Sequence, residues 1–364
     1  MFKFHKLAIQ NMKPQHAKTL LITLIGLVIL FVLAFVSVIP VSAAIQTLVL
    51  SLMMQQITGK VIALIALAIL LPILLYIFIG YPLIAGIIHA IRKAINKEKV
   101  SFSDIIASFR KGRYAKSLKL SLFTLLFLVI LGVITYIVVQ LANLGVSHLF
   151  SAIQARLATS EHFIGYALTL NVILVLILAF IQSIITWFFT IVIVNYTTAY
   201  TEDPRRGAWK DVKLGFKGIK NGNKTWFKFF IGILLLNLIV LILDGPVNQA
   251  LVISTGGISQ TVATILINIF MVIVVIVRIL IYYFNIIAVV QYFNRNGRLN
   301  GSDNTTSAQP SVGPSNIQSS GLNAEDYATP SNDETSHHQT ESNVDESQVT
   351  ESDRDTTKSD EPKQ

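Results

Sequence analysis

The chain has 364 residues, of which 53% are hydrophobic and 13% are charged, and its formal net charge is +9. Soluble domains contain about 25% charged residues, so this composition excludes an ordinary soluble globular protein and indicates a multi-span membrane protein. The absence of cysteine excludes disulfides, thiolate catalysis and cysteine metal sites.

The net charge hides two parts of opposite sign. Residues 301–364 contain 13 acidic and 3 basic residues, whereas residues 1–300 contain 7 acidic and 26 basic residues. The basic body and acidic tail indicate a body that meets a charged membrane surface. Nucleic acid is not an expected partner, because the basic residues flank apolar runs instead of forming a soluble basic face.

The first predicted element is a membrane span. Residues 1–18 are basic, and residues 20–39 form an uninterrupted apolar run. A cleaved signal peptide is the rival interpretation, because residues 41–43 form a tolerable cleavage site. The apolar core of a signal peptide is about 7–15 residues long, however, and this run is longer. We therefore expect an uncleaved first span.

Six apolar runs are long enough to cross a hydrocarbon core, which needs about 20 apolar residues. The six predicted spans are residues 19–40, 61–91, 118–141, 166–200, 227–244 and 261–293. The second, fourth and sixth are longer than needed, so we expect them to tilt, to kink or to project beyond the bilayer. Pro72 and Pro82 favour a kink in the second span.

Lysine and arginine are concentrated on one side of the predicted spans. Twenty-three of them precede the first span, follow the last span or lie in the loops 92–119 and 205–228. The opposite loops contain only Lys60 and Arg156. By the positive-inside rule, we expect a multi-pass protein of the cytoplasmic membrane with both termini in the cytoplasm.

The chain is expected to divide into a six-span domain, residues 1–300, and a polar tail, residues 301–364. Serine, threonine, amide and acidic residues dominate the tail, which has few large apolar side chains. A segment of this composition cannot bury a core, so we expect it to be disordered. It either binds an unknown protein or is a solvated, dispensable extension.

The segments before the third and fifth spans are similar to each other. The matched positions are Phe102, Asp104 and Phe109 in one copy and Trp209, Asp211 and Phe216 in the other. A weaker copy begins at Phe4, where Lys6 replaces the aspartate. The sequence thus predicts an all-α membrane protein of three repeated helical hairpins, each preceded by a cytoplasmic amphipathic helix.

The three preceding segments combine an apolar stripe at helical spacing with a basic face. Such helices lie in the membrane interface, with aromatic side chains among the headgroups and cations toward anionic lipid. The aspartates are expected in the first turn, where a carboxylate stabilises a helix N-terminus. The alternative is that the segments are stop-transfer flanks with incidental aromatic residues. The candidate anion and lipid contacts are Arg278, Arg110, Lys111, Arg113, Lys116, Lys213, Lys217 and Lys224.

The pattern of residues 102–119 and 209–228, placed between spans, resembles a broad group of uncharacterised bacterial six-helix integral membrane proteins. The membrane domain found beside some glycerophosphodiester phosphodiesterases belongs to the same group. The resemblance covers residues 1–298 and implies a bacterial membrane protein, but it implies no activity. The phosphodiesterase catalytic domain has no counterpart in this sequence.

Arg278 is the one strong charge deep in a predicted span. It lies about 25 Å from the outer start of the sixth span, in the inner third of the bilayer. It either faces the bundle, where it binds an anion or pairs with Asp104 or Asp211, or snorkels to the cytoplasmic headgroups. Polar residues within the spans are expected to hydrogen-bond between helices, with a polar translocation path as the alternative. These residues are Asn171, Gln182, Asn195, Asn237, Asn268 and Asn285.

The sequence contains no catalytic constellation. It has no zinc-protease motif, no metal spacing of histidines, no phosphate-binding glycine loop and no pair of carboxylates within a span. We therefore expect no cofactor and no metal, and a non-enzymatic protein that organises or binds anionic lipid at the inner leaflet. The alternative is a transporter or permeation pathway for an anionic or amphiphilic solute, through Arg278. An intramembrane enzyme that acts on lipid is the third possibility.

Overall fold

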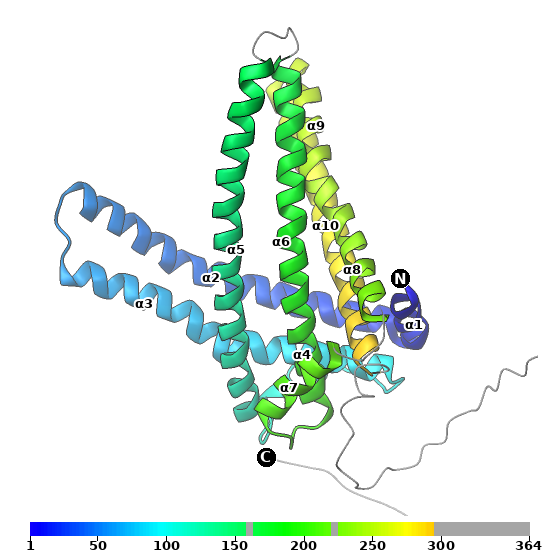
Figure 1. Ribbon diagram of the computed structural model, residues 1–364. Helices are drawn as coiled ribbons and strands as arrows, with labels where there is room; N and C mark the ends of the chain where they lie inside the picture. Colours follow the sequence, from blue (N-terminus) through cyan, green and yellow to red (C-terminus); the bar gives the residue numbers. More distant parts are fainter. Residues whose placement is uncertain (158–162, 220–224, 295–364) are drawn as a thin grey trace, which may run out of the picture. The chain divides into compact units, whose positions relative to one another are not determined.

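The computed structural model describes residues 1–157, 163–219 and 225–294 (Figure 1). This part of the chain is all-helical, without β-strands, and has six helices long and apolar enough to cross a membrane. The predicted tail lies outside the described residues. The α-helices are α1 (Lys3–Met12), α2 (His16–Met53), α3 (Gly59–Leu75), α4 (Tyr81–Ile95), α5 (Tyr114–Leu157), α6 (Phe163–Glu202), α7 (Ala208–Ile219), α8 (Thr225–Ile242), α9 (Asn248–Ser254) and α10 (Gln260–Tyr292).

Several helices extend beyond the predicted spans. Helix α2 ends at Met53 and α5 at Leu157, whereas the spans were predicted to end at residues 40 and 141. The residues that follow these two apolar runs are rich in alanine and leucine and contain no proline, and α2 also continues through Pro40. An apolar run sets the length that can lie in lipid, but it does not set the end of a helix.

The second membrane helix is interrupted near its prolines. A π-helical turn, Tyr76–Gly80, joins α3 to α4 between Pro72 and Pro82. Pro82 has no N–H and cannot donate the usual helical bond to the carbonyl of Phe78. The hydroxyl of Tyr114 donates a hydrogen bond to that carbonyl, 3.0 Å away. The start of α5 thus satisfies a backbone group that the proline leaves open.

Large apolar side chains are exposed along most of each membrane helix and become buried toward one end. The last exposed ones are Ile79 on the second membrane helix, Phe188 on α6 and Tyr282 on α10. Beyond these positions, α4 and the ends of α6 and α10 are largely buried. The extra length of the second, fourth and sixth predicted spans therefore builds a packed core.

Each membrane helix thus has an exposed apolar part and a buried end. The apolar belt is the exposed apolar surface of residues 21–79, 122–149, 165–188 and 235–282. The basic end comprises residues 1–20, 80–121, 189–219, 225–234 and 283–294, and it carries most of the lysine and arginine of the described chain.

The core of the basic end is formed mainly by α4 and α10, with side chains from α1, α6 and α8. Phe229 of α8 stacks on Tyr292 of α10, with ring centres 4.6 Å apart. Phe4 of α1 meets Tyr292 edge-on at 5.0 Å. These rings join α1, α8 and α10 into one packed unit.

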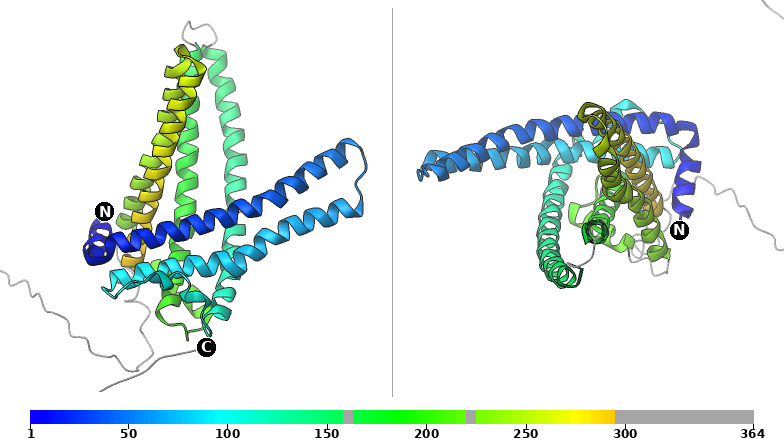
Figure 2. Two further views of the ribbon diagram at one scale, coloured as in Figure 1. Left: turned by 180° about the vertical axis from the view of Figure 1, so that it is seen from behind. Right: turned by 90° about the horizontal axis from the view of Figure 1, so that it is seen from above.

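Three short elements pack around this core. Helix α1 packs against α10, residues 102–109 pack against α4, and α7 packs against α6 (Figure 2). Residues 102–109 and α7 each follow their partner helix closely in the chain. Helix α1, by contrast, meets α10 from the other end of the sequence, and His5 Nε2 lies at hydrogen-bond distance, 3.1 Å, from Asn285 Oδ1.

Residues 102–109 do not form the expected α-helix. They form two 3₁₀ turns, Phe102–Asp104 and Ala107–Phe109. Their backbone lies close to α4, because a Cβ added to Gly86 would lie 1.7 Å from the carbonyl oxygen of Ile105. The carboxylate of Asp104 accepts a hydrogen bond from the backbone N–H of Ser101 and so closes the first of these turns.

Candidate functional site

Two aromatic side chains are exposed on the basic end next to lysines. Phe102 is 50% exposed and Trp209 is 55% exposed. The Nζ of Lys18 lies 5.9 Å from the centre of the Phe102 ring, and the Nζ of Lys213 lies 5.6 Å from a ring of Trp209. Cations and aromatic faces attract at this range. We name these four residues the aromatic rim.

The predicted aromatic stripe of α7 also has a packing role. Trp209 lies 5.5 Å from Phe123 of α5, and Phe216 meets Phe127 of α5 edge-on at 5.8 Å. Phe216 nevertheless remains 41% exposed. The stripe therefore combines packing on α5 with an exposed edge. Phe109, its counterpart in the other copy, stacks on the ring of Tyr114.

The predicted cationic contacts fall into several groups. Arg110, Lys111, Lys213 and Lys217 are exposed. Arg113 is half-buried, and its carbonyl accepts a hydrogen bond from the hydroxyl of Tyr200 at 3.1 Å. The side chain of Lys116 is only 10% exposed and is ion-paired, so it does not form part of the exposed surface. Lys224 lies outside the described residues.

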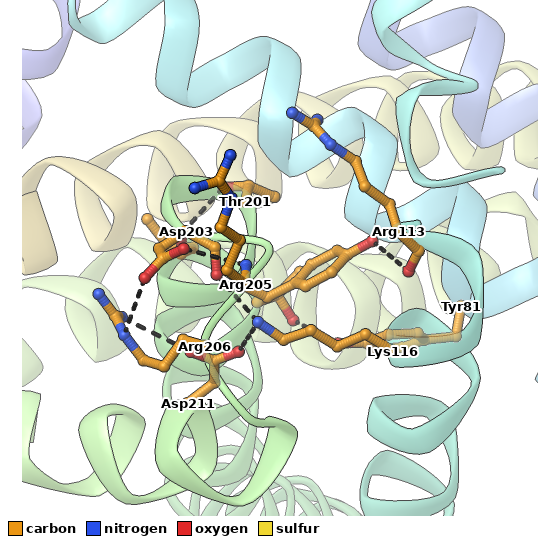
Figure 3. A network of polar contacts seen from close by, with 11 residues as sticks. Tyr81, Arg113, Lys116, Thr201, Asp203, Arg205, Arg206 and Asp211 are labelled. Atoms are coloured by element: carbon orange, nitrogen blue, oxygen red, sulfur yellow. Dashed lines mark hydrogen bonds and ion pairs between the residues drawn. The ribbon is translucent and has the colours of Figure 1, made fainter. Parts of the chain in front are cut away.

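A buried polar network lies where α5, α6 and α7 meet (Figure 3). The Nζ of Lys116 lies 2.7 Å from Oδ2 of Asp211, and it also donates to the carbonyl of Asp203 at 2.9 Å. Arg206 bridges the two aspartates, 3.5 Å from Asp211 and 3.8 Å from Asp203. The network ties the start of α5 to the loop between α6 and α7.

Burial dominates the titration of Asp211, which is fully buried. Loss of solvent raises the pKa of its carboxyl to about 6, although Lys116 and Arg206 both favour the ionised form. Its repeat counterpart, Asp104, behaves differently. Burial acts against ionisation there as well, but the N–H of Ser101 and the ammonium of Lys93 outweigh it and lower the pKa of Asp104.

Asp104 connects the two 3₁₀ turns to α4. Its carboxylate accepts hydrogen bonds from Lys93 Nζ at 3.0 and 3.1 Å and from the backbone N–H of Ser101 at 2.8 Å. Both repeat aspartates lie in the first turn of their element and are buried. Each therefore fastens its element to a cation of a neighbouring segment.

Sequence reasoning did not identify the partners of these aspartates. Lys116 was predicted as an anion or lipid contact, and Lys93 was only one of many lysines that flank spans. The available signal was the scarcity of carboxylates, because only seven occur before residue 301 and two of them occupy matched positions. A rare acidic residue in a basic segment is a candidate for a buried ion pair.

Arg278 pairs with a carboxylate that the sequence analysis did not consider as its partner. Its NH2 atom lies 2.8 Å from Oδ2 of Asp244, which stands in a π-helical turn, Leu243–Val247, between α8 and α9. Asp104 and Asp211 are held by other cations, so the proposed pairing of Arg278 with either of them is wrong. Helices α8 and α10 are neighbours, and this brings Asp244 to the level of Arg278.

Three of the predicted polar residues make interhelical hydrogen bonds. The side chain of Asn195 donates to the carbonyl of Gly215, that of Asn237 donates to the hydroxyl of Ser183, and that of Asn285 donates to the carbonyl of Ile233. These contacts join α6 to α7, α6 to α8 and α8 to α10. Their role in the described chain is packing.

Within the described ranges, no group of three or more His, Asp or Glu side chains has a metal-binding arrangement. Comparisons with protein-family models, with curated proteins and with solved structures find no match to this chain.

Proposed function

We propose that this protein binds and organises anionic lipid at the membrane leaflet that its basic end faces. The observation that carries the proposal is the aromatic rim, which places exposed rings beside lysines at the edge of the apolar belt. Aromatic rings favour the headgroup region, and lysines near the surface attract anionic headgroups. The protein acts as a non-enzymatic membrane component, and its tail binds a protein partner.

The distribution of charge indicates which membrane leaflet the basic end faces. Lysine and arginine lie almost entirely at one end of the six helices, so the positive-inside rule places that end in the cytoplasm. The inner leaflet of a plasma membrane is then the surface in contact with the aromatic rim. The bacterial setting rests on the resemblance to six-helix bacterial membrane proteins alone.

The proposed architecture is three repeated units, each a short element followed by an outgoing and a returning helix. In its support, each short element packs on a returning helix: residues 102–109 on α4, α7 on α6 and α1 on α10. The contact of α1 with α10 joins the last unit to the first, because α1 belongs to the first unit and α10 to the last. Parallel repeats of this kind imply a pseudo-axis along the membrane normal.

The first copy of the repeat fits best with a shifted register. Phe4, His5 and Ala8 are buried in α1 at the same spacing as Asp211, Val212 and Gly215 in α7. Phe4 thus occupies the place of the aspartate, and Lys6 is not its counterpart. In this register α1 has an apolar side chain, Phe4, at the position where the other copies have an aspartate.

Lipid retention tests the proposed function. The protein is reconstituted in nanodiscs that contain equal amounts of anionic and neutral phospholipid, extracted gently, and analysed by native mass spectrometry. A variant with Arg110, Lys111, Lys213 and Lys217 changed to glutamine is compared with wild type. Each surface cation contributes about 1 kcal/mol to the attraction of anionic lipid, roughly a fivefold effect. We expect the ratio of anionic to neutral adducts to fall at least several-fold.

Lys60→Gln is the matched control, because Lys60 is exposed at the opposite end of the membrane helices. It should leave the ratio of adducts unchanged. An unchanged ratio in the fourfold variant would refute lipid binding by the basic end, and an equal fall in both variants would show a general effect of charge.

A further inference from the structure

An ion pair lies inside the apolar belt of this protein. Arg278 and Asp244 are 2.8 Å apart, and their side chains are 39% and 44% exposed. Arg278 is about 6 Å along α10 from Tyr282, where the belt ends. Ionised side chains at such depth are costly unless they face a cavity or a partner, and they mark binding sites and pathways.

Each member of the pair lines a different cavity. Arg278 lines a cavity of about 370 Å³ whose walls come from α2, α4, α6 and α10 and are almost wholly apolar. Asp244 lines a cavity of about 210 Å³ between α6 and the segment that contains Gly245 and Pro246. The ion pair therefore stands between the two spaces. The larger cavity falls within the usual size of small-molecule sites, about 300–1,000 Å³.

The backbone around Asp244 is irregular. The π-helical turn Leu243–Val247 interrupts the fifth membrane helix, and Pro246 cannot donate the helical hydrogen bond that the carbonyl of Ile242 would accept. Turns of this kind are frequent at functional sites, and broken membrane helices accompany transport sites. Such a turn allows Asp244 to change position without unfolding of α8.

Arg278 has a hydrogen-bond donor that Asp244 leaves unused. Its Nε is buried and makes no hydrogen bond, although the pair with Asp244 occupies the NH2 atom. A guanidinium is shaped to bind carboxylate or phosphate through two parallel N–H groups. An anionic group in the larger cavity thus has a donor available and an adjacent apolar wall for a hydrocarbon chain.

We propose that Arg278 binds the anionic group of a single-chain amphiphile whose hydrocarbon chain occupies the larger cavity. The bound anion takes the place of Asp244 on Arg278, and Asp244 moves toward the smaller cavity. The volume of the larger cavity suits one chain better than two. The inference goes beyond lipid binding at the aromatic rim and uses none of the rim residues.

The test is the affinity of a fluorescent long-chain fatty acid for the full-length protein in nanodiscs of neutral lipid. Because Asp244 competes for Arg278, Asp244→Asn should tighten binding about tenfold, whereas Arg278→Gln should weaken it about tenfold. Arg278→Lys keeps the charge and should bind more tightly than Arg278→Gln. The methyl ester of the probe, which has no charge, should bind equally to all variants.

Two controls separate this site from the aromatic rim and from a loss of folding. The variant with Arg110, Lys111, Lys213 and Lys217 changed to glutamine should bind the fatty acid as wild type does, so failure of either proposal leaves the other intact. Thermal unfolding identifies a variant that does not fold. If Asp244→Asn does not fold, the affinities of Arg278→Lys and Arg278→Gln test the proposal, and equal affinities of these two variants would overturn it. Equal affinity of acid and ester, or equal weakening by Asp244→Asn and Arg278→Gln, would overturn the proposal.

Discussion

The pKa values of two aspartates at the basic end shift in opposite directions, and the same physical balance explains both shifts. Asp211 is buried more completely than its cations can offset, so its pKa is raised to about 6. Asp104 accepts three hydrogen bonds from Ser101 and Lys93, so its pKa is lowered despite burial. The balance between desolvation and local donors decides the sign.

These shifts predict opposite effects of pH on stability. Between pH 3.8 and about 6, folded Asp211 holds a proton that the unfolded chain releases, so its contribution to stability falls as pH rises through this window. Asp104 contributes stability that is present above pH 3.8 and is lost as pH falls below that value. Thermal unfolding in detergent, followed against pH, measures both effects.

The matched variants for this measurement are Asp211→Asn and Asp104→Asn. Asp211→Asn should flatten the dependence of the unfolding midpoint on pH between about 4 and 6, even if burial of an unpaired Lys116 lowers all midpoints. Asp104→Asn should keep that slope. The same slope in wild type and Asp211→Asn would show that Asp211 titrates normally.

At the residue scale, the sequence predicts which cations are exposed better than which are paired. Arg110 and Lys213 were expected at the surface and are there. The pair of Lys116 with Asp211 and the pair of Arg278 with Asp244 join residues far apart in the chain or on different helices. Such contacts depend on tertiary packing, which local patterns of charge do not encode.

At the scale of elements, close helix contacts depend on small residues at particular positions. Gly86 brings α4 into contact with the backbone of Ile105, and Gly215 brings α7 close to Tyr196 of α6, where an added Cβ would lie 2.9 Å from that residue. In both cases a short element meets a returning helix. These glycines therefore set the distance at which the basic end packs.

Gly86→Ala should destabilise the protein by about 3 kcal/mol, because the added methyl group must displace the backbone at Ile105. Gly59→Ala is the control, since a Cβ at Gly59 meets nothing within 4 Å and alanine favours the helix. Thermal midpoints in detergent compare the two. Equal midpoints would mean that residues 102–109 do not lie against α4.

The sequence identifies the six membrane helices but not their ends or the form of the short elements. Apolar runs reveal helices because lipid demands them. Helix α2 continues through Pro40 to Met53, and a count of apolar residues does not predict this continuation. The backbone of residues 102–109 lies against Gly86, and an amphipathic stripe cannot reveal that contact.

At the scale of the whole described chain, the apolar belt and the basic end are two environments on the same helices. The last exposed apolar residues of the three returning helices are followed by buried ones. In the proposed function, this change marks the membrane surface. The aromatic rim then lies in the headgroups, and the ion pair of Arg278 and Asp244 lies about one turn or more inside the hydrocarbon.

The most direct test of this account is the membrane depth of single spin labels. Because the chain has no cysteine, Phe102→Cys, Trp209→Cys and Val272→Cys each provide one labelling site. In anionic vesicles, the label at Val272, in the belt, should collide with dissolved oxygen and not with a water-soluble nickel chelate. Labels at positions 102 and 209 should show intermediate collisions with both and should move deeper as the anionic lipid fraction rises. Labels at positions 102 and 209 that collide only with the aqueous reagent, whatever the lipid, would contradict the proposed function.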